Sequence, residues 1–207
     1  MACTCVATSA GARCPARKNN VMPTAYTHTL LKKICAHLAN GGIIAYATAS
    51  CLGLGCDPNN INAINMLLKI KQRPRSKGLI VIADKLKRLE PFIKPLSTEE
   101  KKRAQAKWPG AHTWLMPASH RASAALHGQH KKIAVRVDAH PDTAGLCKAL
   151  GMALVSTSAN VSGKRPVKTY RDCVRQFGNR VMVVPGRIGQ SKTASTIQDF
   201  ETGKVFR

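Results

Sequence analysis

Acidic residues are scarce in this sequence of 207 residues, which holds 10 Asp and Glu against 33 Lys and Arg and has a formal net charge of +23. The first acid along the chain is Asp57, and no acids stand in a DxD or ExxH arrangement. This disfavours hydrolases that work with two carboxylates in one cleft. The charge favours an anionic partner, either a polyanion such as RNA or a small polyphosphate. Charge alone does not decide between the two.

Aromatic residues and long apolar runs are also lacking. Phe, Trp and Tyr make up 4% of the chain, so a stacking platform for single-stranded nucleic acid is poorly supported. The apolar runs, such as 42–45 and 79–83, are far too short for a membrane span. No apolar segment of the kind found in secretion signals stands near the N-terminus. We expect a cytoplasmic protein, although the acid-free residues 1–22 leave a transit peptide open.

Metal-ligand spacings and the two common nucleotide-binding motifs are absent as well. The eight cysteines include no CxxC pair, and no matching His spacing follows the group of Cys3, Cys5 and Cys14. We therefore expect reduced, structural cysteines and no metal site. The chain has no GxxxxGK[ST] loop and no GxGxxG motif, so any ATP is bound by another geometry.

What is present is the composition and periodicity of one folded domain, with 44% apolar residues. Residues 1–26 lack periodicity and are interpreted as a loose N-terminal extension, and the domain is expected over 27–207. Apolar spacing from 31 to 38 predicts an amphipathic helix. Further helices are expected from Asn59 or Asn60 and near 98–107, 142–150 and 169–177, and strands at 43–48, 78–84, 113–117, 133–137, 153–156, 181–184 and 196–198. This alternation predicts a single α/β domain with a mixed sheet.

The densest cluster of cations is the segment 71–78, KQRPRSKG, which ends the second expected helix and leads into an apolar strand. Four cations in seven residues at such a boundary suit the binding of phosphates or carboxylates, with Arg as a bidentate fork and Lys as a point charge. The alternative is a solvated helix end whose cations offset the helix dipole. Composition gives the two interpretations about equal weight.

A second cluster, the segment 154–163, runs from a strand into the small polar residues of LVSTSANVSG. At the carboxyl end of a strand, such a loop offers backbone N–H groups and short side-chain donors to an anionic ligand. The competing interpretation is an ordinary polar turn.

Taken together, the two clusters identify a family. Lys71-x-Arg73 with Ser158-x-Asn160 resembles the Lys/Arg/Ser/Asn signature of YrdC/TsaC-type threonylcarbamoyl-AMP synthases. Other segments stand in the same order as in that family, over about residues 28 to 207: GLGCD at 53–57, WPG at 108–110, AVRV at 134–137, STSAN at 156–160, VPG at 184–186, STI at 195–197 and TGKVFR at 202–207. These motifs are specific in combination and not singly.

The resemblance implies a twisted mixed sheet with flanking helices and a basic concave cleft. It also implies a reaction in which L-threonine and bicarbonate form N-carboxythreonine, whose carboxylate attacks the α-phosphorus of ATP. Pyrophosphate leaves, and threonylcarbamoyl-AMP remains. A separate transferase complex then passes the group to adenosine 37 of tRNAs that read codons beginning with A. Magnesium is expected mainly on phosphate oxygens, because protein carboxylates are scarce.

The same resemblance assigns roles to individual residues. Lys71 and Arg73 are expected to contact the nucleotide phosphates and the carbamate, with Ser158 and Asn160 on the opposite side. The remaining candidates are Thr48 and Thr113 for the threonine pocket, Arg136 for the threonine carboxylate or a phosphate, Ser156 for the substrate, and Ser195 and Thr196 near the nucleotide. Because the attacking carbamate is already anionic, positioning and charge neutralisation carry this chemistry, and no strong protein base is required.

Two segments depart from the family pattern. Where the family usually has Tyr-Pro-Thr-Glu, this chain has Ala47 and Ala49 in place of the Pro and the Glu. The usual Pro-Gly-Pro-x-Thr has Ala111 at the second proline, which loosens the turn. His112 in that turn either meets a phosphate or is simply solvated.

The charge of +23 leaves open an alternative of another class. A non-catalytic RNA-binding or ribosome-maturation protein would use the same concave surface without turnover, and the loss of the Glu at position 49 suits it. Retention of the signature residues argues against it, because a surface that recognises only phosphate backbone needs neither the Ser nor the Asn.

Overall fold

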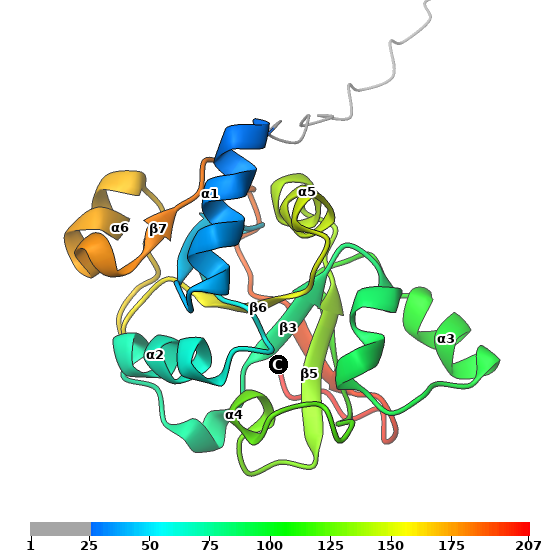
Figure 1. Cartoon of the computed structure of the whole chain (residues 1–207). Helices are drawn as coiled ribbons and strands as arrows, with labels where there is room; N and C mark the ends of the chain where they lie inside the picture. Colours follow the sequence, from blue (N-terminus) through cyan, green and yellow to red (C-terminus); the bar gives the residue numbers. More distant parts are fainter. Residues whose placement is uncertain (1–25) are drawn as a thin grey trace, which may run out of the picture.

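The computed structural model describes residues 26–207 as one mixed β-sheet with helices on both faces (Figure 1). The sheet order is β7-β1-β2-β6-β3-β5-β4-β8, with three parallel pairs (β1/β7, β3/β5, β4/β8) among antiparallel ones. The strands are β1 (Ile44–Ala47), β2 (Leu52–Gly55), β3 (Ile80–Ala83), β4 (His112–Pro117), β5 (Lys132–Val137), β6 (Leu154–Ser158), β7 (Met182–Val183) and β8 (Thr196–Asp199). The expected α/β class with a mixed sheet is confirmed.

Six α-helices lie in the described part of the chain: α1 (His28–Ala39), α2 (Ile61–Lys71), α3 (Thr98–Gln105), α4 (Ala124–His127), α5 (Pro141–Leu150) and α6 (Tyr170–Phe177). None of them is long and apolar enough to cross a bilayer. The expected extension falls outside the described residues except for its last residue, and the group of Cys3, Cys5 and Cys14 lies wholly outside them.

Local sequence explains where the first two helices begin and end. The Thr27 hydroxyl accepts from the N–H of Leu30 and caps α1, and Asn40 ends that helix before Gly41, which has a φ of 76°. The side chain of Asn60 accepts from the N–H of Ala63 and caps α2, so Asn60 is the capping residue of the two that were expected. The α2 helix ends at Lys71, one residue into the basic segment 71–78.

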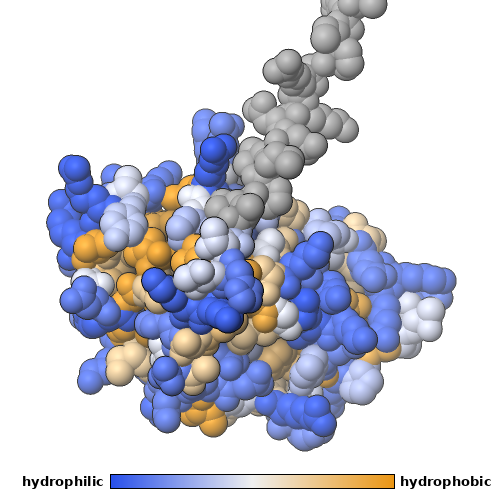
Figure 2. All heavy atoms as spheres, turned by 45° about the horizontal axis from the view of Figure 1, so that its top comes forward, coloured by the Kyte–Doolittle hydropathy of each residue, from blue (hydrophilic) through white to orange (hydrophobic). Residues whose placement is uncertain are grey.

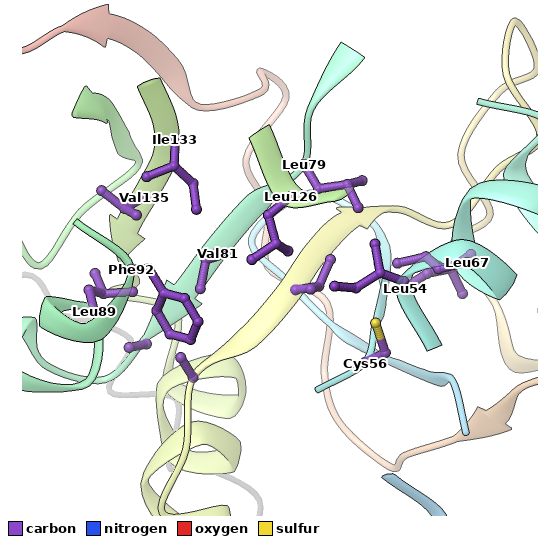
Figure 3. Packing of buried hydrophobic residues seen from close by; sticks show 14 of the residues in the cluster. Leu54, Cys56, Leu67, Leu79, Val81, Leu89, Phe92, Leu126, Ile133 and Val135 are labelled. Carbon is purple, nitrogen blue, oxygen red and sulfur yellow. The ribbon is translucent and has the colours of Figure 1, made fainter. Parts of the chain in front are cut away.

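Strand alternation divides the sheet into two faces. Val81, Val135 and Val155 stand side by side in three neighbouring strands and belong to the larger hydrophobic core. Figure 3 shows Val81 and Val135 in this core together with Leu67 of α2 and Leu126 of α4. The next row, Ile80, Ala134 and Ser156, faces the other way because successive side chains of a strand point to opposite faces.

That second face is only partly covered. Helices α1 and α5 pack over one end of it through a smaller core that includes Ile34, Leu146, Tyr46 and Ile82. In the view of Figure 2, hydrophilic side chains cover most of the molecular surface, and hydrophobic ones show in smaller areas between them. The rest of the second face, around Ile80 and Ala134, is left for a cleft.

Sequence patterns did not predict strand β2, because Gly53 and Gly55 make its sequence LGLG resemble a loop. Glycine is required at both positions because neighbouring atoms leave no room for a Cβ. A Cβ at Gly55 would lie 2.4 Å from the carbonyl oxygen of Val155, and one at Gly53 would lie 2.9 Å from Cγ2 of Thr48. The missing side chains let β2 fit against β6 and let the loop after β1 fold over β2.

Gly55→Ala is expected to lower the free energy of unfolding by about 2–3 kcal/mol, because the new methyl group collides with backbone. Gly151→Ala is the matched control: Gly151 lies in the left-handed helical region with a φ of 72° and a ψ of 12°, and the nearest atom to a built Cβ is 4.0 Å away, so conformational strain of about 1 kcal/mol is the whole cost. Urea denaturation of both variants measures the difference. Equal losses would contradict the steric explanation.

Candidate active site

A cleft of about 1410 Å³ opens on the uncovered part of the second sheet face. Its floor includes Ile80, Ala134 and Ser156, the row of side chains opposite the larger core. Of the residues predicted from the sequence, six line it: Thr48, Arg73, Arg136, Ser156, Ser158 and Ser195. These come from five separate stretches of the chain, so the fold brings together what the sequence keeps apart.

Lys71 connects the end of α2 to the loop after β6. Its side chain is buried, and its Nζ lies 2.5 Å from the carbonyl oxygen of Ser158, 2.9 Å from that of Asn160 and 3.1 Å from Oδ1 of Asn160. An ammonium has three N–H donors, and these three oxygens account for all of them. Burial, followed by the charge of Arg73, lowers the pKa of Lys71 to about 8.

The loop after β6 is held in place by further contacts. Ser158 Oγ donates to Oδ1 of Asn160 at 2.6 Å, and Nδ2 of Asn160 donates to the carbonyl of Lys164 at 2.6 Å. The N–H of Ser162 donates to the carbonyl of Lys71 at 2.8 Å. Three of the four signature residues, Lys71, Ser158 and Asn160, are therefore in direct contact. Ser158 faces the cleft, while Lys71 and Asn160 stand behind its lining.

Arg73 follows a left-handed turn at Gln72, which has a φ of 50°. Its Nη2 donates to the carbonyls of Lys77 and Gly78 at 2.6 and 2.9 Å, and its Nε donates to Gly78 at 3.2 Å. Among the described residues Nη1 has no hydrogen-bond partner, and it is the guanidinium nitrogen left for an anion. The other two guanidinium nitrogens, Nε and Nη2, stabilise the turn formed by the segment 71–78, which we call the basic turn.

Arg136 projects from β5 into the same cleft with its side chain 13% exposed. One nitrogen, Nη2, pairs with Oδ2 of Asp138 at 2.6 Å. Nε is buried without a hydrogen-bond partner. A buried, unsatisfied donor on the wall of a cleft is the kind of group that a bound carboxylate or phosphate satisfies.

The loop after β1 closes one end of the cleft. Thr48 Oγ1 donates to the carbonyl of Cys51 at 2.8 Å, and the N–H groups of Gly189 and Ser191 donate to the carbonyls of Thr48 and Ala49, both at 2.9 Å. A Cβ at Gly189 would lie 2.7 Å from the carbonyl oxygen of Ala49. This close packing of a second segment fixes the turn without a proline. Ala47 is held in turn through its carbonyl, which accepts from the hydroxyl of Thr143 at 2.9 Å.

Thr113 lies beneath the lining. It is fully buried and shares a hydrogen bond of 3.1 Å with the hydroxyl of Ser195, which does reach the cleft. Thr196 is half-buried in β8 and is not part of the lining. His112 is also outside it: its ring packs edge-on against Trp114 with centroids 4.3 Å apart, and burial, assisted by Lys107, lowers its pKa.

Sequence reasoning assigned no role to the last residues of the chain. The N–H of Phe206 donates to the carbonyl of Ile197, and the carbonyl of Arg207 accepts from the N–H of Ile197, so this segment runs beside β8. Phe206 and Arg207 line the cleft as a result. Arg73 and Arg207 both line the cleft, and burial, followed by the charge of Arg207, lowers the pKa of Arg73. The TGKVFR motif at 202–207 was the available signal.

No group of three or more His, Cys, Asp or Glu side chains suited to a metal ion occurs in the described part of the chain. Asp199 is the acid in the cleft lining, and both of its oxygens lie within 2.8 Å of Nζ of Lys132. That carboxylate is engaged, so the lining contains no carboxylate free to hold Mg²⁺.

Comparison with known proteins places the chain among relatives of similar length. A family model described as "Sua5_yciO_yrdC: Telomere recombination" matches residues 36–207. A threonylcarbamoyl-AMP synthase of Methylobacillus flagellatus is 55% identical over 170 residues, which cover 82% of this chain and 94% of that protein. A threonylcarbamoyl-AMP synthase of Thiobacillus denitrificans is 51% identical over 172 residues, which cover 83% of this chain and 92% of that protein.

Solved structures show the same fold at lower identity. The P. abyssi Sua5 protein complexed with L-threonine matches with a TM-score of 0.74 and 24% identity, over 86% of this chain and 53% of that one. E. coli YciO matches with a TM-score of 0.76 and 22% identity, over 90% of this chain and 92% of that one. From the match over residues 36–207 and from relatives that share half of its residues over four fifths of its length, the chain belongs to the Sua5/YciO/YrdC family.

Proposed function

We propose that this enzyme makes threonylcarbamoyl-AMP and pyrophosphate from L-threonine, bicarbonate and ATP. The amino nitrogen of threonine bonds to the carbon of bicarbonate, and water is lost, which gives N-carboxythreonine. A carboxylate oxygen of this carbamate then forms a bond to the α-phosphorus of ATP. The bond between that phosphorus and the bridging oxygen to the β-phosphate breaks, and pyrophosphate leaves with the electron pair. The observation that carries the proposal is the convergence of Arg73, Arg136 and Ser158 on one cleft, in a chain whose relatives include synthases of this name.

The charges of the cleft suit this displacement. A carbamate and a triphosphate repel each other, so the two anions react only where cations neutralise them and hold them in line. Arg73 offers Nη1 and Arg207 lies close enough to depress its pKa, which gives two guanidinium groups for the phosphates. The carbamate needs no protein base at this step, and Asp199, the acid of the described cleft lining, is already paired with Lys132.

We assign Lys71 a positioning role beside its expected contact with the nucleotide. Its three donors are already engaged by Ser158 and Asn160, so Nζ reaches a phosphate only by releasing one of these oxygens. In the engaged state the ammonium holds the loop after β6 against the end of α2. Ser158 is thereby presented to the cleft from the side opposite Arg73.

The threonine end of the cleft is assigned to Arg136, Ser156 and Thr48. Arg136 has a buried Nε without a partner, which suits a carboxylate, and Ser156 lies on the neighbouring floor. Thr48, Thr113 and Ser195 make up the surrounding polar wall, with Thr113 acting through Ser195. A solved P. abyssi Sua5 complexed with L-threonine supports a threonine site in this fold.

The product's destination follows from the same proposal. A separate transferase complex passes the threonylcarbamoyl group to adenosine 37 of tRNAs that read codons beginning with A, and the enzyme acts in the cytoplasm with some affinity for RNA. Mg²⁺ accompanies ATP on its phosphate oxygens, because the described cleft lining has no free carboxylate to hold the ion.

A second candidate function is a basic RNA-binding or ribosome-maturation protein without turnover. The net charge of +23 favours it, because acids are too few to offset the cations of the surface. The two functions differ in a simple way: the RNA binder shows salt-sensitive RNA affinity and releases no pyrophosphate.

Pyrophosphate release from ATP by the purified enzyme is expected only when threonine and bicarbonate are both present, because the attacking group exists only after the two combine. A coupled pyrophosphate assay with each component omitted in turn measures this dependence. Equal release without threonine would refute the proposed reaction.

Lys71→Met keeps the length of the side chain and removes its charge and donors. We expect pyrophosphate release to fall about 100-fold or more and the free energy of unfolding to fall by about 1–3 kcal/mol, because buried oxygens lose their partner. Arg73→Ala should lower pyrophosphate release by a similar factor. Lys69→Met, on the exposed face of the same helix, is the control and should change neither quantity. Normal turnover by Lys71→Met would show that the loop needs no such anchor.

Arg136→Lys retains a positive charge and loses the guanidinium fork. Because we assign this side chain to the threonine carboxylate, we expect the KM for threonine to rise roughly 10-fold and the KM for ATP to stay within about twofold. Steady-state kinetics with each substrate varied separately measures both. The opposite pattern would move Arg136 to the phosphate side of the cleft.

A further inference from the structure

One arm of the cleft carries cationic side chains that the proposed reaction has not yet used. Residues 127–132, with the sequence HGQHKK, run along the wall that leads into β5. His127, His130 and Lys131 of this segment line the cleft, and Lys77 of the basic turn lines it beside them. We call these four residues the basic arm.

The basic arm has no acid to offset it. No ion pair or side-chain hydrogen bond involves Lys77, His127, His130 or Lys131 within residues 26–207. The acid in the cleft lining, Asp199, is already paired with Lys132. Uncompensated cations gathered in a concave surface attract anions more strongly than the same charges on a convex one.

Backbone packing holds the arm directly beside Arg73. The N–H of Leu79 donates to the carbonyl of Leu126 at 2.6 Å. A Cβ at Gly128 would lie 2.4 Å from the carbonyl oxygen of Ser76, so the turn after α4 touches the basic turn with no space between them. Arg73 donates to two carbonyls of that same turn. The position of His127 relative to the guanidinium is therefore fixed by the fold.

The imidazole of His127 is itself incompletely satisfied. Its Nδ1 is buried and has no hydrogen-bond partner. Polar atoms of this kind are rare in folded proteins and are usually satisfied by a ligand or water that completes the site. Within residues 26–207 no hydrogen bond engages the imidazole, and His127 lines the cleft, so a bound anion is a candidate partner for the ring.

We propose that the basic arm binds the β- and γ-phosphates of ATP and, after the displacement, the pyrophosphate product, with Lys77 and His127 as its principal contacts. The inference rests on the proposed function, and it adds a site for the leaving group. In-line displacement requires the attacking carbamate and the departing pyrophosphate to lie on opposite sides of the α-phosphorus. With the carbamate toward Arg136, the leaving group extends past Arg73, where the arm lies.

The chemistry of the arm suits a diphosphate better than the rest of ATP. Pyrophosphate carries several negative charges on a compact group and accepts hydrogen bonds from ammonium and imidazolium donors. None of its four residues is a Phe, Tyr or Trp on which an adenine could stack, whereas Phe206, which also lines the cleft, lies outside the arm. The adenosine of ATP therefore belongs elsewhere in the cleft.

Calorimetric titration with inorganic pyrophosphate tests the site without threonine or turnover. The Lys77→Gln and His127→Gln double variant is expected to bind pyrophosphate roughly 10-fold or more weakly than the unaltered enzyme, because an ammonium and an imidazole donor are lost. Its affinity for AMP, which has no β- or γ-phosphate, should stay within about twofold. In turnover, the KM for ATP should rise while that for threonine does not.

Lys148→Gln and His120→Gln serve as controls, because they remove the same residue types from exposed positions outside the cleft and should leave pyrophosphate binding unchanged. Lys77→Gln alone changes an exposed side chain and keeps the test valid if the double variant fails to fold. Unaltered pyrophosphate affinity in a folded variant, or an equal loss of AMP and pyrophosphate binding, would overturn the proposal. Release of pyrophosphate without threonine would refute the reaction while leaving this binding result intact.

Discussion

The buried ammonium of Lys71 is the interaction on which the candidate site depends. It lies at the end of α2, and all three of its donors are directed at two residues of the loop after β6. Lys71 is 87 positions from Ser158 and 89 from Asn160 in the chain, and these hydrogen bonds hold the two segments in direct contact. Removing one buried partner of such a group leaves oxygens without donors, which costs more than the contact itself contributes. The hydrogen bonds of Lys71 therefore fix the end of α2 and the Ser158–Asn160 segment relative to each other.

The sheet supplies the second constraint. Because side chains alternate along each strand, the rows that build the larger core also determine which residues face the opposite side. Helices α1 and α5 cover one end of that side, and the rest becomes the floor of the cleft. Ser156 and Arg136 reach the cleft from adjacent rows for this reason. Their placement is a consequence of core packing and needs no separate explanation.

Much of this arrangement could be predicted from the sequence. Sequence patterns predicted the helices α1, α2, α3, α5 and α6, and the family resemblance implied that the segments 71–78 and 154–163 meet at one cleft. Strand β2 was missed because glycines that prevent a collision with neighbouring backbone also look like loop residues. Thr113 is buried because it contacts Ser195, and His112 lies outside the cleft because it packs against Trp114. No local sequence pattern encodes these tertiary contacts. Of the basic arm only Lys77 stood in a predicted cluster; His127, His130 and Lys131 were missed because they resemble any solvated loop.

The pairing of the last residues with β8 has a practical consequence. This short segment shields the edge strand and places the side chain of Arg207 among the lining residues. Any polypeptide joined directly behind Arg207 therefore starts at the rim of the cleft. A bulky group attached there would compete for the entrance that substrates use.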